Sequence, residues 1–400
     1  MEKGFPGRES YWTAKEVSIK SETMKRSQAA LLVWFAFAVL RVNAAIALWE
    51  DGYHVYPGDS IQEALQKAAE NTTNKIVRVH AGEYRPGSKG QALIWLNRKH
   101  DGIRVEAVGE VTLTAANPAL AAQSEASFPA VVNHVVYFGD GISSNTVLKG
   151  FRITGANSFM TKERTREMEP NVTIPRNWFF FADGGAIKIF GRSYPTIQNV
   201  EVVENFTSPC GAGISVQHQG YNQNAVLIES CLFLRNRTQV TGAAIDLLAG
   251  SAARIINCLF VGNVSNTGED VVARQSGERP FVNSGVVTIF QNSRAEVRNC
   301  TFTGNRNGVD DMGGQSRFVN CIFFDNKLMD GLKGSARYDL AVNGGAKEVT
   351  GCFFDGTVHD VGHVVAAEKN TLNAPPPGFN KSFVPEAPEY KSAGYRPKRD

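Results

Sequence analysis

The sequence has almost no net charge beyond its first segment, and it has no apolar run long enough to span a membrane. Residues 1–44 contain seven of the 42 basic residues and four of the 39 acidic residues, so the rest carries 35 of each. Such a balanced chain has no long-range field for nucleic acid or an anionic membrane. The 38 glycines follow no three-residue period, which excludes collagen, and a hydrophobic content of 42% excludes disorder.

The apolar run near the start has the pattern of a secretory signal. Met24-Lys25-Arg26 precedes the apolar residues 29–40, and small residues follow at 43–47. A spanning helix needs roughly 20 apolar residues, so this run is too short for one. A basic start, an apolar core and a small-residue cleavage site define a signal peptide. We expect residues 1–47 to be an upstream segment and signal peptide, and the mature chain to be secreted, periplasmic or at the cell surface. A membrane anchor is the alternative.

Residues 59–84 have the pattern of a helix followed by a strand. Ser60 can cap the helix while Glu63 reaches back in a capping box. One apolar face is formed by Ile61, Ala64, Leu65 and Ala68. The sequence therefore predicts a helix over 60–69, a strand over 76–80 and a turn over 81–84.

A short pattern recurs along the chain: Cys, any residue, Phe, two residues, then Asn. The copies start at Cys231, Cys258, Cys300 and Cys321, with imperfect copies at Val200 and Cys352. Successive copies are 31, 27, 42, 21 and 31 residues apart. A second element of Gly-Ala-Ile type lies between copies. This is the pattern of a solenoid with loops of variable length.

The spacing within a copy indicates which solenoid. Residues two apart lie on the same side of a strand, so each Cys and Phe point inward and the following Asn occupies a corner. Asn tolerates left-handed backbone and bonds neighbouring main chain. We therefore predict an all-β fold, a single-stranded right-handed parallel β-helix over residues 48–370, with an N-terminal capping helix. Residues 371–400 form a Pro-rich extended tail.

Two segments resemble known families. Residues 55–64, continuing to Gly82-Glu83-Tyr84, resemble the N-terminal cap of the pectin-lyase-like superfamily of β-helix proteins. The pairing of Gly-Gly-Ala-Ile with Phe-x-x-Asn is similar to repeats in chlamydial polymorphic outer-membrane proteins. The likeness covers roughly residues 50–365 and implies the fold. It implies no single activity, because the superfamily mixes polysaccharide lyases, hydrolases, epimerases, adhesins and proteins of no known activity.

The six cysteines of an exported chain suggest disulfides by default. Five of them occupy one inward column, however, and neighbours in register on parallel strands point the same way instead of toward each other. The sequence therefore favours a buried column of free thiols over disulfides. The sequence contains no Cys-x-x-Cys pair of the kind that would indicate a zinc site.

Polar residues follow the inward positions of the Gly-Ala-Ile strands. Lys188, Ser215, Asp246 and Thr288 should form an outward column, with Lys188 and Asp246 about 10 Å apart. A lyase needs a base and a cation beside a carboxylate. We expect Lys188, His218 and Asp246 as catalytic residues, and Ser215, Gln217 and Thr288 as substrate-binding residues. Insertions at 158–182 and 264–283 would wall this groove. A solvated polar face is the alternative.

Acidic residues gather after the corner asparagines. Asp270, Asp310, Asp311 and Asp330 would stack on consecutive turns and repel one another unless a cation bridges them, so Ca²⁺ is the candidate cofactor. Solvent-exposed turn acids are one alternative, and an inverting glycosidase pair is another. Asp310-Asp311 resembles the paired acids of polygalacturonase-like hydrolases, but the Gly-His-Gly and Arg-Ile-Lys elements of that pattern are absent.

The outward positions of the Cys-bearing strands are apolar, and they require a cover. The residues concerned are Leu232, Leu234, Leu259, Val261, Ile322, Phe324 and Phe353. The tail after Ala374 carries Phe379, Phe383 and Tyr390, and an extended segment can lie along a sheet. We expect the tail to cover this face; a partner subunit is the rival.

Two functions fit these patterns. The first is a secreted β-helix protein that binds a polysaccharide or surface glycan in a groove along one sheet, with lyase or hydrolase activity as a candidate chemistry. The second is a non-catalytic glycan-binding, structural or adhesin β-helix. No nucleic-acid partner and no membrane span of the mature chain are expected, and the sequence does not specify the oligomeric state.

Overall fold

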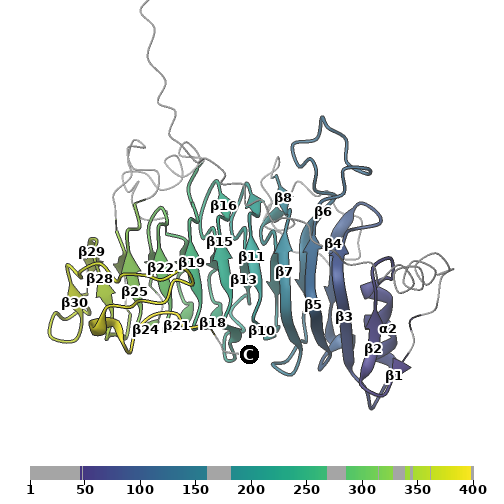
Figure 1. Cartoon of the computed structure of the whole chain (residues 1–400), viewed down its shortest axis with the longest axis horizontal. Coiled ribbons are helices and arrows are strands. Elements are labelled where there is room, and N and C mark those ends of the chain that lie inside the picture. The colour runs from purple at the N-terminus through teal and green to yellow at the C-terminus, as the bar shows by residue number, and fades with distance from the viewer. Residues whose placement is uncertain are drawn as a thin grey trace, which may run out of the picture. The chain divides into compact units, whose positions relative to one another are not determined.

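The computed structural model describes residues 46, 48–159, 182–267, 285–313, 315–327, 338–342, 346–360 and 362–397. They belong to one compact unit, Ile46–Asp400. Short parallel strands wind into a coil whose successive turns stack side by side (Figure 1). The predicted all-β parallel solenoid is confirmed. The segment predicted as a signal peptide lies outside the described residues, apart from Ile46.

One wall of the coil is a nine-stranded parallel sheet. In spatial order its strands are β4(Gly90–Leu96), β6(Val132–Phe138), β9(Ile187–Phe190), β13(Ile214–Gln217), β17(Ile245–Leu247), β20(Val287–Ile289), β23(Val309–Asp311), β26(Leu340–Val342) and β29(Val358–Asp360). The Gly-Ala-Ile elements supply the middle strands, and Ile187, Ile214 and Ile245 are paired in register.

The second sheet has eighteen strands. It starts with β1(Leu48–Trp49), antiparallel to β2(Gly52–Val55), and continues through the long strands β3(Ile76–Tyr84), β5(Arg104–Thr114) and β7(Val147–Thr154). The strand predicted over 76–80 thus includes the predicted turn at 81–84, with a register shift between His80 and Gly82.

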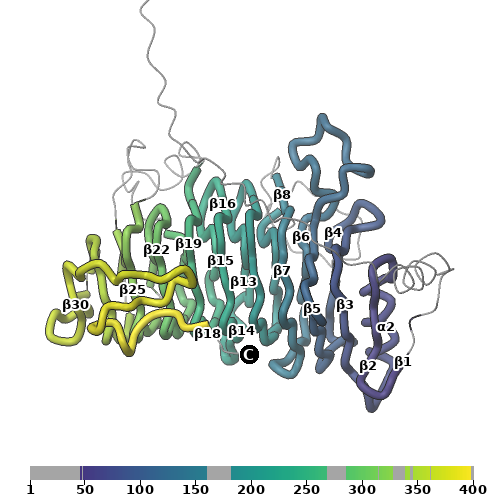
Figure 2. The backbone as a smooth tube through the Cα atoms, in the orientation of Figure 1, coloured from purple at the N-terminus to yellow at the C-terminus, as the bar shows by residue number. Residues whose placement is uncertain are grey.

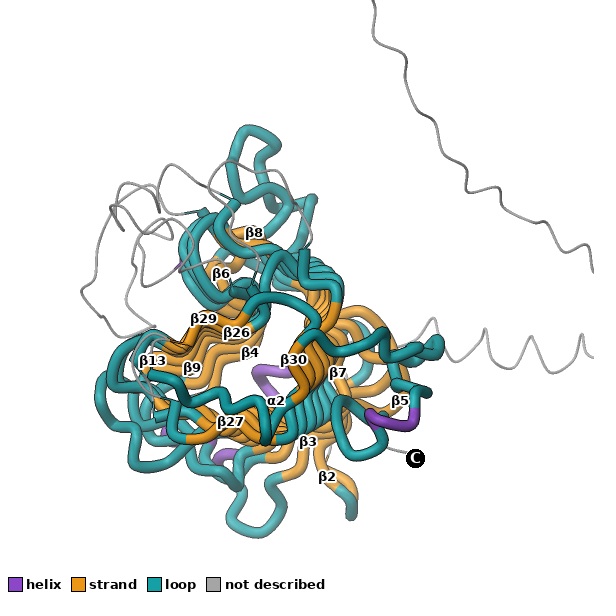
Figure 3. Tube along the Cα trace, turned by 90° about the vertical axis from the view of Figure 1, so that its left-hand side faces the viewer, coloured by secondary structure: helices purple, strands orange, loops and turns teal. Residues whose placement is uncertain are grey.

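After β7 this sheet divides into two rows. The first row is β10(Thr196–Gln198), β14(Val226–Glu229), β18(Ala252–Ile256), β21(Arg294–Arg298), β24(Arg317–Val319) and β27(Glu348–Thr350). The second row is β11(Glu201–Val203), β15(Leu232–Leu234), β19(Leu259–Val261), β22(Thr301–Thr303), β25(Ile322–Phe324), β28(Phe353–Phe354) and β30(Thr371–Leu372). A small third sheet contains β8(Asn157–Ser158), β12(Phe206–Thr207) and β16(Arg237–Thr238). Seen along the coil, these walls enclose the core (Figure 3).

Helix α2(Ile61–Glu70) packs against β2, β3 and β4 at the N-terminal end of the coil. Ser60 Oγ accepts from Glu63 N at 3.2 Å, and the predicted apolar face is buried. Gln62 pairs twice with the edge strand β4: its Nε2 donates to Trp95 O at 2.9 Å, and its Oε1 accepts from Trp95 N at 2.8 Å. The side chain thereby occupies backbone groups that an edge strand leaves open. A role as a cap stays a prediction.

The interior is built from stacked columns of identical side chains. The rings of Phe233, Phe260, Phe302, Phe323 and Phe354 stack with centroids 4.4–5.0 Å apart. All six cysteines are buried and free, which confirms the predicted column of thiols. Each thiol of the column reaches a backbone carbonyl; Cys300 Sγ, for example, lies 3.4 Å from Ile255 O. Burial raises the pKa of Cys231, Cys300 and Cys352 well above the ordinary value, which keeps these thiols protonated.

The corner asparagines form a second column, and one of the two predicted reasons is confirmed: their side chains bond neighbouring main chain, as Asn236 does with Asn205 N and Val202 O. Asn205, Asn236, Asn263, Asn305 and Asn326 are buried, and each of the first four side-chain amides donates to the next amide oxygen along the series at 2.9–3.1 Å. The left-handed backbone expected at these asparagines instead occurs at the preceding residue, such as Glu204 or Arg235. The asparagine itself points inward, where its amide can satisfy buried backbone groups.

The C-terminal segment lies across the outer face of the second sheet, as expected (Figure 2). Tyr390, in the short 3₁₀-helix η2(Pro388–Tyr390), is buried with its ring 4.4 Å from that of Phe353. Phe379 meets Phe324 edge-on. Further along, Asn257 exchanges two hydrogen bonds of 2.7 Å with the backbone of Arg396. The tail therefore covers the apolar face of β25 and β28.

Candidate functional site

The predicted outward column exists as a row of paired residues on the nine-stranded sheet. Lys188 is in register with Ser215, Ser215 with Asp246, and Asp246 with Thr288. Trp95 and Tyr137 precede Lys188 in the row, and Asp310 follows Thr288. Strand β13 lies between Lys188 and Asp246, as the predicted separation of about 10 Å requires.

The prediction that this column is open to a ligand is wrong. Lys188, Ser215, Asp246 and Thr288 are each 0% exposed. Lys188, Ser215 and Asp246 are buried because a glycine in left-handed backbone precedes each of them by four residues. These glycines are Gly184, Gly211 and Gly242. A Cβ atom on these glycines would lie 2.7–3.1 Å from the Cβ atoms of Lys188, Ser215 and Asp246. The segment preceding each strand therefore folds over the outer face at a distance that only glycine allows.

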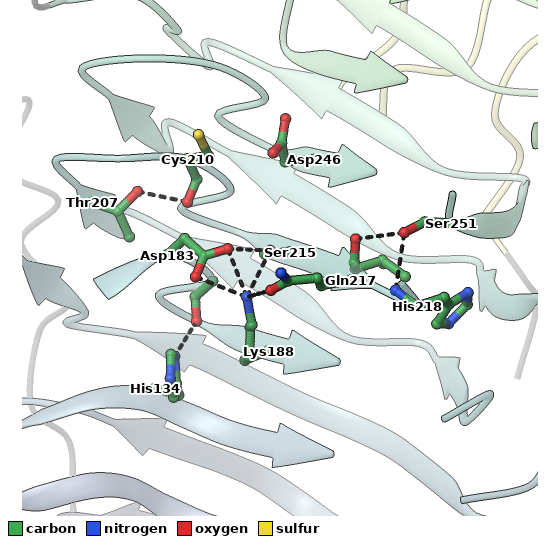
Figure 4. Close-up of polar contacts among 12 residues, drawn as sticks. His134, Asp183, Lys188, Thr207, Cys210, Ser215, Gln217, His218, Asp246 and Ser251 are labelled. Atoms are coloured by element: carbon green, nitrogen blue, oxygen red, sulfur yellow. Dashed lines mark hydrogen bonds and ion pairs between the residues drawn. The ribbon is translucent and has the colours of Figure 1, made fainter. Parts of the chain in front are cut away.

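The segment that covers the strand also brings Asp183, which was not among the predicted site residues, into contact with Lys188. Lys188 Nζ donates to both carboxylate oxygens of Asp183, at 2.8 and 2.7 Å, and to Gln217 Oε1 at 2.9 Å. Ser215 Oγ donates to Asp183 Oδ2 at 2.7 Å (Figure 4). Asp183 and Lys188 have fully buried side chains. All three donors of the ammonium group are engaged, so Lys188 stabilises the covering segment and is not available as a base.

The acids of the column also have internal partners. Asp246 Oδ1 accepts from Thr241 Oγ1 at 3.0 Å, while burial raises the pKa of Asp246 to about 8. Asp310 accepts from Gly285 N at 2.9 Å and from the Tyr338 hydroxyl, and burial raises its pKa to about 7. Burial disfavours the charged form of both carboxyl groups, and neither side chain is exposed to a ligand.

His218 is a structural residue and not a free base. Its Nε2 lies 2.8 Å from Ser193 O, and its Nδ1 accepts from Ala252 N at 3.2 Å. This arrangement requires the neutral ring with the proton on Nε2. Burial lowers the pKa of His218 to about 4, in keeping with a neutral imidazole. In Figure 4 the ring points away from Lys188.

The structure describes two of the four predicted calcium ligands, and these two do not face each other. Asp310 and Asp311 are consecutive on β23, so their side chains point to opposite sides of the strand. Asp311 is in register with Ile289 and Val342 on the inward side. Asp270 and Asp330 lie outside the described residues, as does most of each predicted groove wall. Among the residues that the structure describes, no group of three or more His, Cys, Asp or Glu side chains is placed to hold a metal ion.

In the middle of this sheet, from β9 to β23, the accessible positions are those two residues further along the chain. Gln217 is in register with Phe190. Leu248, Phe290 and Met312 follow on the next strands, with backbone amides donating to Val216, Leu247 and Ile289 respectively. We call Phe190, Gln217, Leu248, Phe290 and Met312 the outer strip; each member is partly exposed. Of these five residues, only Gln217 was predicted to contact a ligand. The sequence does contain a pattern that indicates the strip, because an apolar residue stands three positions after the inward Ile or Val in four of the five repeats.

Comparisons with known proteins agree with this architecture. Residues 133–284 match the family model of the right-handed beta helix region. The described strands on both sides of this region continue the same parallel pairing, so the protein is a right-handed parallel β-helix protein. No curated protein and no solved structure matches the chain significantly. The resemblance to the pectin-lyase-like superfamily and to the polymorphic outer-membrane proteins stays a prediction.

Within the described ranges, no helix has the length and apolar content needed to cross a bilayer.

Proposed function

We propose that this protein is a secreted or cell-surface β-helix that binds a polysaccharide along the outer strip without cleaving it. One observation carries the proposal. The side chains expected to do acid–base chemistry are fully buried, whereas the partly exposed outer strip consists of two phenyl rings, a leucine, a methionine and one amide. Rings and amides are suited to stack on a sugar and hydrogen-bond its hydroxyls, but they offer no proton-transfer group.

The spacing of the strip suits a repeating ligand. Members on neighbouring turns are separated by one inter-strand step of about 4.8 Å, so the two rings, one at the end of β9 and one directly after β20, are three steps apart. A regular polymer can contact such a rigid row at several points, and each further contact adds affinity without new ordering of the protein.

The test is binding of the purified protein to immobilised neutral and uronate polysaccharides, with and without Ca²⁺, while soluble products are followed by absorbance and reducing ends. We expect retention on at least one polymer and no products. Phe290→Ala should weaken retention roughly tenfold. Leu372→Ala is the matched control, because Leu372 is exposed on β30 of the other sheet. Steady release of unsaturated or newly reducing sugars would contradict the proposal, as would equal effects of the two variants.

A further inference from the structure

A pocket of about 580 Å³ lies at the N-terminal end of the coil, between helix α2, the end of β4 and the short 3₁₀-helix η1(Arg98–His100). It falls within the range typical of small-molecule sites. Its lining includes Trp95 and Asn97. Trp95 is the first residue of the outward column that contains Lys188. Asn97 lies two residues further along the chain, just after β4. It is the first residue of a second row, which continues into the outer strip. The pocket therefore lies at one end of that strip.

The pocket has a rigid aromatic wall. Trp95 is partly exposed, yet its Nε1 is buried and has no hydrogen-bond partner among the described residues. The surface that the ring presents is therefore carbon. Its ring meets Tyr137 edge-on at 6.3 Å, and its backbone is held by the two hydrogen bonds from Gln62. A fixed indole surface of this kind is suited to the C–H face of a sugar ring.

The remaining lining is polar and balanced in charge. Gln66 and Glu70 are one turn apart on α2, and Lys99 faces them from η1. All three side chains are exposed, and within the described residues none has a hydrogen bond or ion pair. They offer an amide, one carboxylate and one ammonium group, which can donate to and accept from neutral hydroxyls. With one charge of each sign, the pocket has no excess charge to favour a uronate.

Between the pocket and the strip the row continues through Gly139, which is buried and adds no side chain. Gly139 stands between Asn97 and Phe190 in the row, and a Cβ atom there would lie 3.7 Å from Asn97 Cβ and 3.1 Å from the Tyr137 ring. We infer that this pocket binds the terminal neutral sugar unit of a polysaccharide whose following units lie along the outer strip. The inference rests on the proposed function and adds recognition of a chain end.

The experiment is titration calorimetry of the full chain with maltose, cellobiose and lactose, the corresponding neutral hexasaccharides where available, and digalacturonate as the charged probe. At least one neutral disaccharide should bind, more tightly than digalacturonate. Gln66→Ala should weaken that disaccharide roughly tenfold, the value of one lost hydrogen bond to a ligand. Glu63→Ala is the control, since Glu63 lies on the same helix and does not line the pocket.

The outcomes separate this inference from the proposed function. Phe290→Ala should leave disaccharide affinity unchanged and weaken the hexasaccharide. If hexasaccharides bind through Phe290 but are insensitive to Gln66→Ala, the pocket inference is overturned and the function stands. Tighter binding of digalacturonate than of every neutral disaccharide also overturns the inference. If no saccharide binds in solution or on a matrix, both fail.

Discussion

The buried asparagine column gives the sharpest test of what holds the coil together. Asn263 Oδ1 accepts from Asn236 N and Asn236 Nδ2, each at 3.0 Å, and Asn263 Nδ2 donates to Phe233 O at 2.8 Å and to Asn305 Oδ1 at 3.1 Å. Asn263→Leu keeps the volume but removes all four bonds.

The cost follows from the buried groups that lose a partner. The backbone N–H of Asn236 and the carbonyl of Phe233 each lose one, and so do the side-chain amides of Asn236 and Asn305, which each keep another partner. At about 1–3 kcal/mol for each of the two backbone groups left unpaired, the free energy of unfolding should fall by roughly 2–6 kcal/mol. A domain has about 5–15 kcal/mol in total. Urea unfolding followed by circular dichroism would show the loss as a lower midpoint.

Asn299→Gly is the matched control. Asn299 lies in the neighbouring corner with φ +53°, a left-handed conformation that glycine adopts without strain. Its replacement should change the free energy of unfolding by less than about 0.5 kcal/mol. If Asn263→Leu costs less than about 1 kcal/mol, or no more than the control, the asparagine column does not contribute as argued.

Three further outcomes follow from the same contacts. Burial raises the pKa of Asp246 to about 8 and of Asp310 to about 7. The folded state therefore binds more protons than the unfolded state from about pH 4 upward, and the free energy of unfolding should fall as the pH rises from about 5 to about 8.5. The thermal midpoint of Asp246→Asn should depend less on pH than that of the unmodified protein. Tyr390→Ala removes the largest buried contact of the tail, at a cost of about 3–5 kcal/mol, and should release it to limited proteolysis while the coil persists. In Gly213→Ala the new Cβ would lie 2.3 Å from Ala244 O, so thermal unfolding should occur at a lower temperature, whereas Gly87→Ala, with nothing within 4 Å, should change little.

The candidate site shows where reasoning from sequence stops. The period of two within a strand placed Lys188, Ser215 and Asp246 in one row, and the structure confirms that row. Their burial depends on how the preceding segment folds over the strand, which involves Asp183 as well as Gly184, Gly211 and Gly242. Nothing in the local pattern distinguishes an outward residue facing solvent from one facing another segment of the same chain.

The sequence by itself determined the coil, because identical residues at matching positions can only stack if the strands are parallel and in register. It determined the inward thiol and phenyl columns, the apolar face of helix α2 and the cover supplied by the tail, since each depends on a short period or on a clear excess of apolar residues. Tertiary structure decided which polar groups meet. The ion pair of Lys188 with Asp183, the two backbone partners of His218 and the accessible position of the outer strip all depend on contacts between segments and turns of the coil, and burial is a property of those contacts, not of any residue alone.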